Sequence, residues 1–545
     1  MKTKNKFFIF CAAAVLMTGC TDLNVDIKSQ YTKLPDTSEG IEAVTAEIYN
    51  PYRSAMGRFH WMAQTLSSDE AVGVSMGSDY YDGGVYRQMS VHNWNADNGM
   101  LGPMWDGAMT GITTCNKTLK MLADVSDEAK APVRAMRAYY HFLQMDNFGD
   151  VPIMGDNAEE HPDRSPRADV CKFIESELLA VKDLLPTDVN EATYGKATRY
   201  MAEGLLAKLY LNWAVYTAAD VAQYSPSDKN EKLNACVAMC DDIIKSGKFN
   251  LSDDYMTKFR PDNGPQIKDF VFVMPFDRET QQGMVHARFW KDRSAKDQFG
   301  TFGSGPAGNI RCLPEFYDKF NLPGDDRNEQ YLTGKQYYWS NYQKTDKPFI
   351  IETTKNGYDQ DYTAADKDEK IEWQMEFPKE ITLRPNGEGT LDVGNDQKGR
   401  AMGYRSIKFY PDVNATTAQG HNQSNDVPII RYADIILMKA EAILRGATAT
   451  NGDTPMSLMN QIRDYVHAPK LTTEPTLNDL LDERAREFAD ESWRRNDLIR
   501  FGKFEDPWGF KYLYKAGYTE KFRRIFPIPT SAMNTNTNWK QNPGY

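Results

Sequence analysis

The sequence predicts a mostly α-helical fold of paired antiparallel helices, with a large loop-rich portion of minor β content. One helix is expected over 196–217, because apolar residues recur there every four positions and form one stripe, at Met201, Leu205, Leu209 and Trp213. The connection 185–188 (Leu-Pro-Thr-Asp) is short and contains a helix breaker, which favours antiparallel helix pairs. Between 251 and 425 glycine, proline and asparagine become frequent, and only short β-like runs such as 270–274 appear.

Further helices are expected on both sides of the loop-rich portion. Periodic apolar stretches before it cover about 38–56, 104–125, 128–146, 168–185 and 228–246. Paired helices of this length resemble tetratricopeptide-type units, although the strict repeat signature is absent, so we expect degenerate repeats. After it, helices are predicted over 431–445, over 455–467 with Thr454 as N-cap, and from Thr476, which opens a capping box.

The composition is that of a folded, acidic protein. The chain has 545 residues, 41% of them hydrophobic and 26% charged, which argues against wholesale disorder. A mean hydropathy of −0.62 leaves no room for several membrane spans. The net charge of −12 argues against nucleic acid as a partner, because phosphate binding needs clustered Lys and Arg. Aromatic residues make up 12% of the chain, so we expect some of them to face a ligand.

The N-terminus has the pattern of a lipoprotein signal peptide. Lys2, Lys4 and Lys6 precede an apolar run of eleven residues, 7–17, which is too short to span a membrane, since spanning takes about 20. The segment Met-Thr-Gly-Cys that ends at Cys20 resembles the bacterial lipobox, in which the cysteine is acylated, for example with palmitate. We therefore expect residues 1–19 to be a signal peptide and Cys20 to be the lipid anchor.

Five cysteines follow Cys20, and an odd, sparse set does not make a disulfide framework. Cys236 and Cys240 are interpreted as buried structural thiols. No cofactor is expected, and the metal content stays open: acidic loops would permit a structural Ca²⁺, but no spaced ligand motif is present.

Five sequence blocks together resemble the SusD/RagB family of outer-membrane nutrient-binding lipoproteins, and they follow the family's order along nearly the whole mature chain. They are 137–142 with 148–153, 195–198 with 205–211, 428–434 with 441–442, 483–488 with 493–500, and 526–529 with 538 and 541–545. Most of these residues have structural explanations: Arg431 and the Arg/Glu-rich stretch 483–500 are expected to form paired networks on helix faces rather than a catalytic site.

The resemblance implies a SusD-like α/α superhelix, in which tetratricopeptide-like helix pairs form a scaffold and a loop-rich remainder carries the ligand surface. It divides the chain into an N-terminal helical region (20–250) with ligand-proximal loops (61–105), a loop-rich segment (251–425), and a C-terminal helical region with an extended tail (426–545). It also implies a protein anchored in the outer membrane and facing the exterior, which covers a SusC-like TonB-dependent β-barrel transporter and captures oligosaccharides or, in some members, peptides.

Sugar binding requires flat aromatic faces and planar polar groups, and both are densest in two segments. The first, 61–105, contains 91–94 and 97–98, which resemble the family's ligand-proximal block; the second, 284–311, faces the first in the family. The candidate ligand-binding residues are Trp61, Asp69, Tyr81, Tyr86, Arg87, Trp94, Asn98, Trp290 and Phe302. Trp105 is expected in the core, and Trp61 is balanced between core and ligand. A further aromatic cluster at 337–342 has no supporting motif.

Two motifs that resemble catalytic sites lack the necessary surroundings. Residues 73–77 match G-x-S-x-G, but loops lie on both sides, so Ser75 is not expected to be a nucleophile. Residues 303–308 match G-x-G-x-x-G without a preceding strand. A glycosidase pair of carboxylates depends on a separation that sequence does not reveal.

We therefore expect a non-enzymatic surface lipoprotein that binds an oligosaccharide, with Trp94 and Trp290 favouring glycan over peptide. The alternatives are a peptide-binding member of the same family, a surface hydrolase that uses Ser75 or a carboxylate pair, and a structural lipoprotein in which both tryptophans are buried.

Overall fold

The computed structural model describes residues 37–156, 162–300, 305–363, 365–415, 421–516 and 518–545. The predicted signal peptide, Cys20 and Phe302 lie outside these residues. Within them, no helix is both long enough and apolar enough to cross a membrane.

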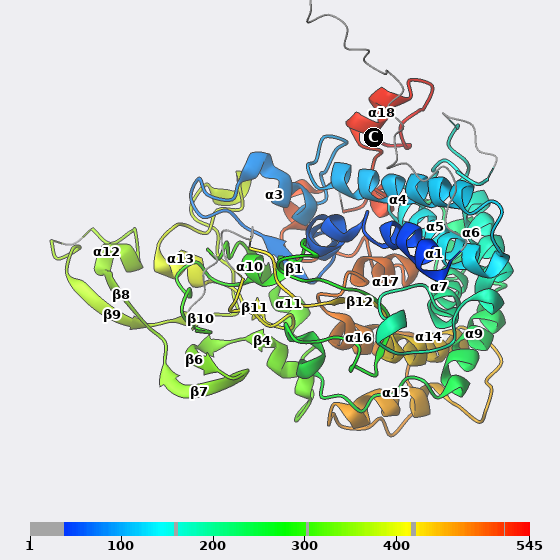
Figure 1. Cartoon of the computed structure of the whole chain (residues 1–545). Coiled ribbons are helices and arrows are strands. Elements are labelled where there is room, and N and C mark those ends of the chain that lie inside the picture. Colours follow the sequence, from blue (N-terminus) through cyan, green and yellow to red (C-terminus); the bar gives the residue numbers. More distant parts are fainter. Residues whose placement is uncertain (1–36, 157–161, 301–304, 364, 416–420, 517) are drawn as a thin grey trace, which may run out of the picture.

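Helices dominate the fold, as predicted, and the longer ones gather on one side of the molecule (Figure 1). These are α4 (Leu101–Met121), α5 (Asp127–Phe148), α6 (Arg167–Val181), α7 (Arg199–Leu211), α9 (Leu233–Ser246), α14 (Tyr432–Leu444), α15 (Pro455–Tyr465) and α16 (Leu477–Phe488). Successive helices pack against each other: α4 on α5, α5 on α6, α7 on α9, and α14 on both α9 and α15. This arrangement is the tetratricopeptide-like scaffold.

Local sequence signals set the ends of these helices. The N-cap predicted at Thr454 and the capping box predicted at Thr476 are present at the starts of α15 and α16, and Thr454 forms a capping box as well. Gly247 ends α9 with a φ of +63°, a conformation that glycine adopts without a steric penalty. The single helix expected over 196–217 is two helices, α7 and α8 (Trp213–Thr217), because Asn212 lies between them and its side chain donates to the Lys208 carbonyl.

Ten shorter α-helices complete the α-helical set of the described residues. They are α1 (Ser38–Thr45), α2 (Trp61–Leu66), α3 (Val85–Ser90), α8, α10 (His286–Trp290), α11 (Pro314–Tyr317), α12 (Lys355–Tyr358), α13 (Gln397–Ala401), α17 (Arg494–Arg500) and α18 (Thr530–Thr535). A π-helix, Ala55–His60, runs directly into α2.

The strands are short and pair antiparallel in two-stranded sheets. The pairs are β1 (Ala71–Gly73) with β3 (Ile310–Cys312), β2 (Phe270–Met274) with β12 (Val427–Arg431), β4 (Tyr331–Leu332) with β11 (Arg405–Ser406), β5 (Gly334–Lys335) with β10 (Glu376–Phe377), β6 (Tyr337–Ser340) with β7 (Gln343–Pro348), and β8 (Ile350–Thr354) with β9 (Lys370–Gln374). The β8–β9 hairpin and α12 extend away from the helical body (Figure 1). The predicted aromatic cluster at 337–342 lies on the β6–β7 hairpin.

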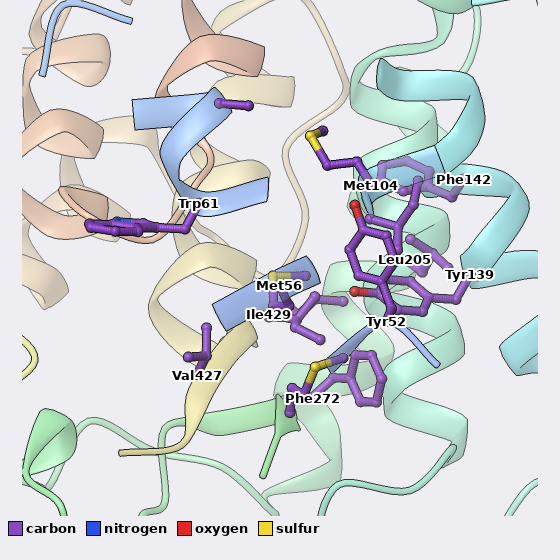
Figure 2. Close-up of a cluster of buried hydrophobic side chains, with 14 of the residues drawn as sticks. Tyr52, Met56, Trp61, Met104, Tyr139, Phe142, Leu205, Phe272, Val427 and Ile429 are labelled. Atoms are coloured by element: carbon purple, nitrogen blue, oxygen red, sulfur yellow. The ribbon is translucent and has the colours of Figure 1, made fainter. Parts of the chain in front are cut away.

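The main core lies between the helical scaffold and the β2–β12 pair. Tyr52, Tyr139 and Leu205 meet there, and Ile429 of β12 covers them from the strand side (Figure 2). Trp61 points away from this group (Figure 2). Trp105 is in the core, as predicted, with 3% of its surface exposed. All five cysteines of the described residues are free and buried, which confirms the interpretation of Cys236 and Cys240.

A network of buried charges joins the loop-rich segment to the C-terminal helices. The Arg431 guanidinium donates to Asp269 (2.7 Å), Glu487 (2.7 Å) and Glu491 (2.8 Å). Burial by itself raises the pKa of Asp269, but the charges of Lys258 and Arg431 outweigh it and hold the pKa at about 2. The predicted paired networks therefore exist, but they lie inside the protein rather than on solvated helix faces.

Candidate functional site

A cavity of about 510 Å³, which we call the α3 pocket, opens between the π-helix, α3 and the turn that follows α3. Its volume lies in the range of small-ligand sites, about 300–1,000 Å³. The lining residues are Arg58, Phe59, Met62, Asp82, Gly83, Val85, Tyr86, Gln88, Asn95, Asp97, Asn98, Gly99 and Met100. The pocket thus combines aromatic and thioether surface with amide, carboxylate and guanidinium groups.

The π-helix supplies one wall of the pocket. Its wider turn places the neighbouring residues Arg58 and Phe59 on the same side, followed by Met62 in α2. The π-helix is held from behind at Gly57, whose carbonyl accepts a hydrogen bond from the Val285 amide at 3.3 Å. A Cβ at position 57 would lie 2.6 Å from the Gly283 carbonyl carbon, so only glycine allows this approach.

A strained loop forms the entrance to α3. Tyr80 and Asp82 have φ values of +60° and +45°, in the left-handed region that residues other than glycine rarely adopt. Gly83 and Gly84, which follow, also have positive φ values. Strain of this kind is typical of binding sites, where surrounding contacts maintain it. The result is that Asp82 projects from the rim of the pocket while Tyr86, one turn further along, lines its interior.

Asn98 fastens the turn after α3 to the helix. Its side-chain nitrogen donates to the Val85 carbonyl at 3.1 Å and to the Gln88 side chain at 2.8 Å, and its oxygen accepts from the Met100 amide at 3.1 Å. With 4% of its surface exposed, Asn98 sets the shape of the pocket more than it offers free hydrogen bonds. Gln88, Asn95 and the two rim carboxylates are the groups left for a ligand.

Three groups in the pocket interact electrostatically. The Arg58 guanidinium carbon lies 5.0 Å from the Phe59 ring centroid and 5.4 Å from that of Phe289, so two rings orient this cation. Burial, and then the Asp82 carboxylate, raise the pKa of the Tyr86 phenol while Arg58 opposes the shift, and the net result is a pKa of about 12. Tyr86 is therefore a neutral hydroxyl close to both charges.

The predictions for the three tryptophans need correction, because all three are buried and their indole nitrogens bind protein atoms. Trp61 and Trp290 both donate to the Asp490 carboxylate, at 2.6 Å and 3.0 Å, and are 0% and 2% exposed. His286 stacks on Trp61 with 3.9 Å between ring centroids. The two predicted segments do meet, as the resemblance implied, but they meet in the core, where neither indole is accessible as a stacking surface.

Trp94 is buried as well. It is 1% exposed and donates to the Tyr545 hydroxyl at 2.8 Å, while Arg523 donates to the Trp94 carbonyl at 3.1 Å. Its role in this arrangement is to anchor the turn that forms one side of the pocket.

The other five predicted ligand residues that the structure describes lie in the pocket, beside it or in contacts within the fold. Tyr86 and Asn98 line the pocket, and Tyr81 is 38% exposed on the adjoining loop. Asp69 is buried in a bidentate ion pair with Arg494, and Arg87 donates to the Glu388 carbonyl at 3.1 Å, so both serve the fold.

Four further residues that line the pocket were not predicted from the sequence: Arg58, Phe59, Met62 and Gln88. Arg58 and Phe59 carry no motif, and the only available signal was their position just before the predicted loops.

Glu70 and Asp490 form a buried pair of carboxyl groups behind the pocket. The Asp490 amide donates to Glu70 at 3.0 Å. Burial, and then the charge of Asp490, raises the pKa of Glu70 to about 8, and burial raises that of Asp490 to about 6. Between pH 4.5, the ordinary pKa of a glutamate, and about pH 8, Glu70 therefore keeps a proton in the folded protein that it releases in the unfolded chain. As the pH rises through this window, the contribution of Glu70 to the free energy of unfolding falls.

We expect Glu70→Gln, which imitates the neutral acid, to flatten this pH dependence. Between about pH 6 and about pH 9 the wild type should lose on the order of 2 kcal/mol more unfolding free energy than the variant, measured by urea unfolding. The exposed Glu191→Gln variant is the control for the change of charge. Parallel pH profiles for wild type and Glu70→Gln would contradict the assignment.

A second, larger cavity of about 550 Å³ lies at the far end of the helical scaffold, between the α8–α9 connection and the end of α14. None of the predicted ligand residues lines it. Its innermost cation, Arg500, is already bound by Glu441 and Asp497. We therefore take the α3 pocket as the candidate site.

The features of a hydrolase are not assembled around Ser75. Its side chain is 1% exposed, its hydroxyl has no hydrogen-bond partner, and its backbone pairs with the segment at Leu391–Val393, so the strand–elbow–helix geometry is not built. Among the residues that the structure describes, no group of three or more His, Cys, Asp or Glu side chains is arranged to hold a metal ion.

The helical scaffold and the α3 pocket define a mostly helical protein with a cavity of mixed polar and aromatic lining. The chain belongs to the SusD family: the model described as "SusD family" matches residues 268–545, and one described as "Starch-binding associating with outer membrane" matches residues 22–211. The predicted resemblance is thereby confirmed.

Individual relatives agree with this assignment. The "Starch-binding protein SusD" of Bacteroides thetaiotaomicron is 24% identical over 440 residues, covering 76% of this chain and 72% of the relative. A solved "Surface glycan-binding protein A" from Bacteroides fluxus shares the fold with a TM-score of 0.66 at 18% identity, over 94% of this chain and all of that one. The Bacteroides thetaiotaomicron surface glycan-binding protein A in complex with laminarihexaose gives 0.64 at 19% identity, over 93% and 99% of the two chains.

Proposed function

We propose that this chain is a cell-surface glycan-binding lipoprotein, which captures an oligosaccharide in the α3 pocket without catalysis. The observation that carries the proposal is the pocket itself: about 510 Å³, with Phe59 and Tyr86 on its walls and amide and carboxylate side chains around its mouth. Aromatic surface receives the C–H face of a sugar, and planar polar groups receive its hydroxyls. Relatives named for starch binding and for a laminarihexaose complex support sugars as the ligand class.

We further propose acylation at Cys20, an outward-facing position on the outer membrane, and delivery of the captured glycan to a SusC-like TonB-dependent transporter. These steps rest on the lipobox-like segment and on membership in a family described as associating with the outer membrane. Labelling of the intact protein with a radioactive fatty acid, compared with Cys20→Ala, tests the anchor. Co-purification with a β-barrel protein from membranes tests the partner.

Titration calorimetry of residues 21–545 against starch and laminarin oligosaccharides tests the proposed function. We expect binding to one glycan class, weakened at least about tenfold in Phe59→Ala, because this change removes the aromatic wall of the pocket. Tyr512→Ala is the matched control, since Tyr512 is 52% exposed and lies outside the pocket. Equal affinity in wild type and Phe59→Ala would place the glycan elsewhere, and heat from peptides alone would replace the glycan by a peptide.

A further inference from the structure

The mouth of the α3 pocket carries an excess of negative charge. Its ionised side chains are Arg58, Asp82 and Asp97, which leaves a net charge of −1. Asp82 and Asp97 are both exposed, and among the described residues neither forms an ion pair. The whole chain adds to this local field with its net charge of −12. A ligand that enters the pocket therefore passes two exposed carboxylates and meets a net negative charge.

The one cation in the pocket does not offset these carboxylates for a ligand. Arg58 is half-buried between the Phe59 and Phe289 rings, and its Nε atom is buried without a partner. Both Arg58 and Asp82 lie close enough to the Tyr86 hydroxyl to shift its pKa in opposite directions. Arg58 and Asp82 thus act on the same hydroxyl with opposite charges, and Asp97 adds the excess negative charge at the mouth.

We infer that the α3 pocket selects neutral sugars against sugars that carry carboxylate or sulfate groups, with Asp82 and Asp97 as the specificity-determining residues; this inference rests on the proposed function. A neutral sugar donates its hydroxyls to the two carboxylates and exchanges hydrogen bonds with Gln88 and Asn95. A uronate or a sulfate meets like charge at the same positions, and the one cation of the pocket lining, Arg58, is half-buried beside two aromatic rings.

A matched pair of ligands tests the inference: the neutral oligosaccharide that binds best, and the same oligosaccharide oxidised at C6 to the uronate. We expect the affinity of the wild type for the oxidised sugar to be at least about fivefold lower than for the neutral sugar. This difference in affinity should become smaller as salt is added, because both carboxylates are exposed and salt screens their charge. Asp82→Asn with Asp97→Asn should bring the two affinities within about twofold of each other, although the affinity for the neutral sugar should itself fall, because charge-assisted hydrogen bonds become neutral ones.

The structure favours these variants as clean probes. Asparagine tolerates the left-handed backbone at position 82 as well as aspartate does, so the loop should keep its shape. Asp127→Asn with Asp183→Asn is the matched control, because it removes the same charge from exposed positions far from the pocket and should leave the difference in affinity unchanged.

Three outcomes count against the inference. Equal wild-type affinity for both sugars overturns the charge selection and leaves glycan binding intact. If the double variant of Asp82 and Asp97 shows the same difference in affinity between the two sugars as the wild type, the charge selection is also overturned, because other residues then cause the discrimination. Absence of binding by both sugars overturns the proposed function, and the inference with it.

Discussion

Arg431→Met is expected to destabilise the protein by about 3–5 kcal/mol, because it leaves buried carboxylates without their main partner. Arg431 is 1% exposed and bonds to Asp269, Glu487 and Glu491, which are all buried. Methionine fills much of the arginine volume, so the loss reports the missing charge rather than a cavity. Urea unfolding followed by tryptophan fluorescence measures the effect.

A graded comparison keeps this prediction testable even if Arg431→Met folds poorly. Arg431→Lys retains one positive charge but not the fork of donors, so its stability should fall between wild type and methionine. Lys172→Met is the surface control: its ion pair with Asp169 spans 3.5 Å between side chains that are 62% and 55% exposed, and pairs of that kind contribute about 0–1 kcal/mol. If Arg431→Met lowers the free energy of unfolding no more than Lys172→Met does, the buried charge network does not stabilise the fold as proposed.

Gly57→Ala is expected to damage both the fold and the α3 pocket. The added Cβ would lie 2.6 Å and 2.8 Å from the backbone of Gly283 and Met284, and backbone atoms cannot move aside as a flexible side chain does. We expect the free energy of unfolding to fall by an amount at the upper end of the range of about 1–3 kcal/mol that is typical of overpacking. Because the π-helix carries Arg58 and Phe59, glycan affinity should also fall by about tenfold or more.

The matched control is Gly102→Ala in α4. A Cβ there meets no atom within 4 Å, so the substitution should be neutral or stabilise the helix by about 0.5–1 kcal/mol. Calorimetry with the glycan and urea unfolding, made on both variants, separate the two effects. A Gly57→Ala protein with wild-type stability and affinity would show that the contact at Gly283 is dispensable.

The fold was predictable because its signals are local. Apolar periodicity located the long helices to within a few residues, and the hydroxyl side chains of Thr454 and Thr476 marked two helix starts correctly. The division at Asn212 was missed, because the apolar stripe continues through it while the backbone does not. The π-helix was also not predicted, because the pattern of its residues does not differ from that of an ordinary α-helix.

The candidate site was predictable only in part. The segment 61–105 overlaps the α3 pocket, and the predicted residues Tyr86 and Asn98 line it. Trp94 and Trp290 are buried, against the prediction, and Trp61, for which core and ligand were weighed equally, lies in the core. Trp94 lies between two asparagines, which is the pattern of an exposed side chain. The burial of the three tryptophans depends on Asp490 and Tyr545, which lie at least 200 positions further along the chain.

These distant partners also determine when the pocket can form. Trp61 binds Asp490, Asp69 binds Arg494, and Trp94 binds Tyr545, over separations of 429, 425 and 451 positions. Closing loops of that length costs entropy that only the completed contacts repay, so such pairings form late in folding. The helices of the N-terminal half can fold as soon as they are synthesised, but the pocket that they flank stays unformed until the C-terminal segment is present. A chain that ended before Asp490 would have most of its helices and no complete α3 pocket.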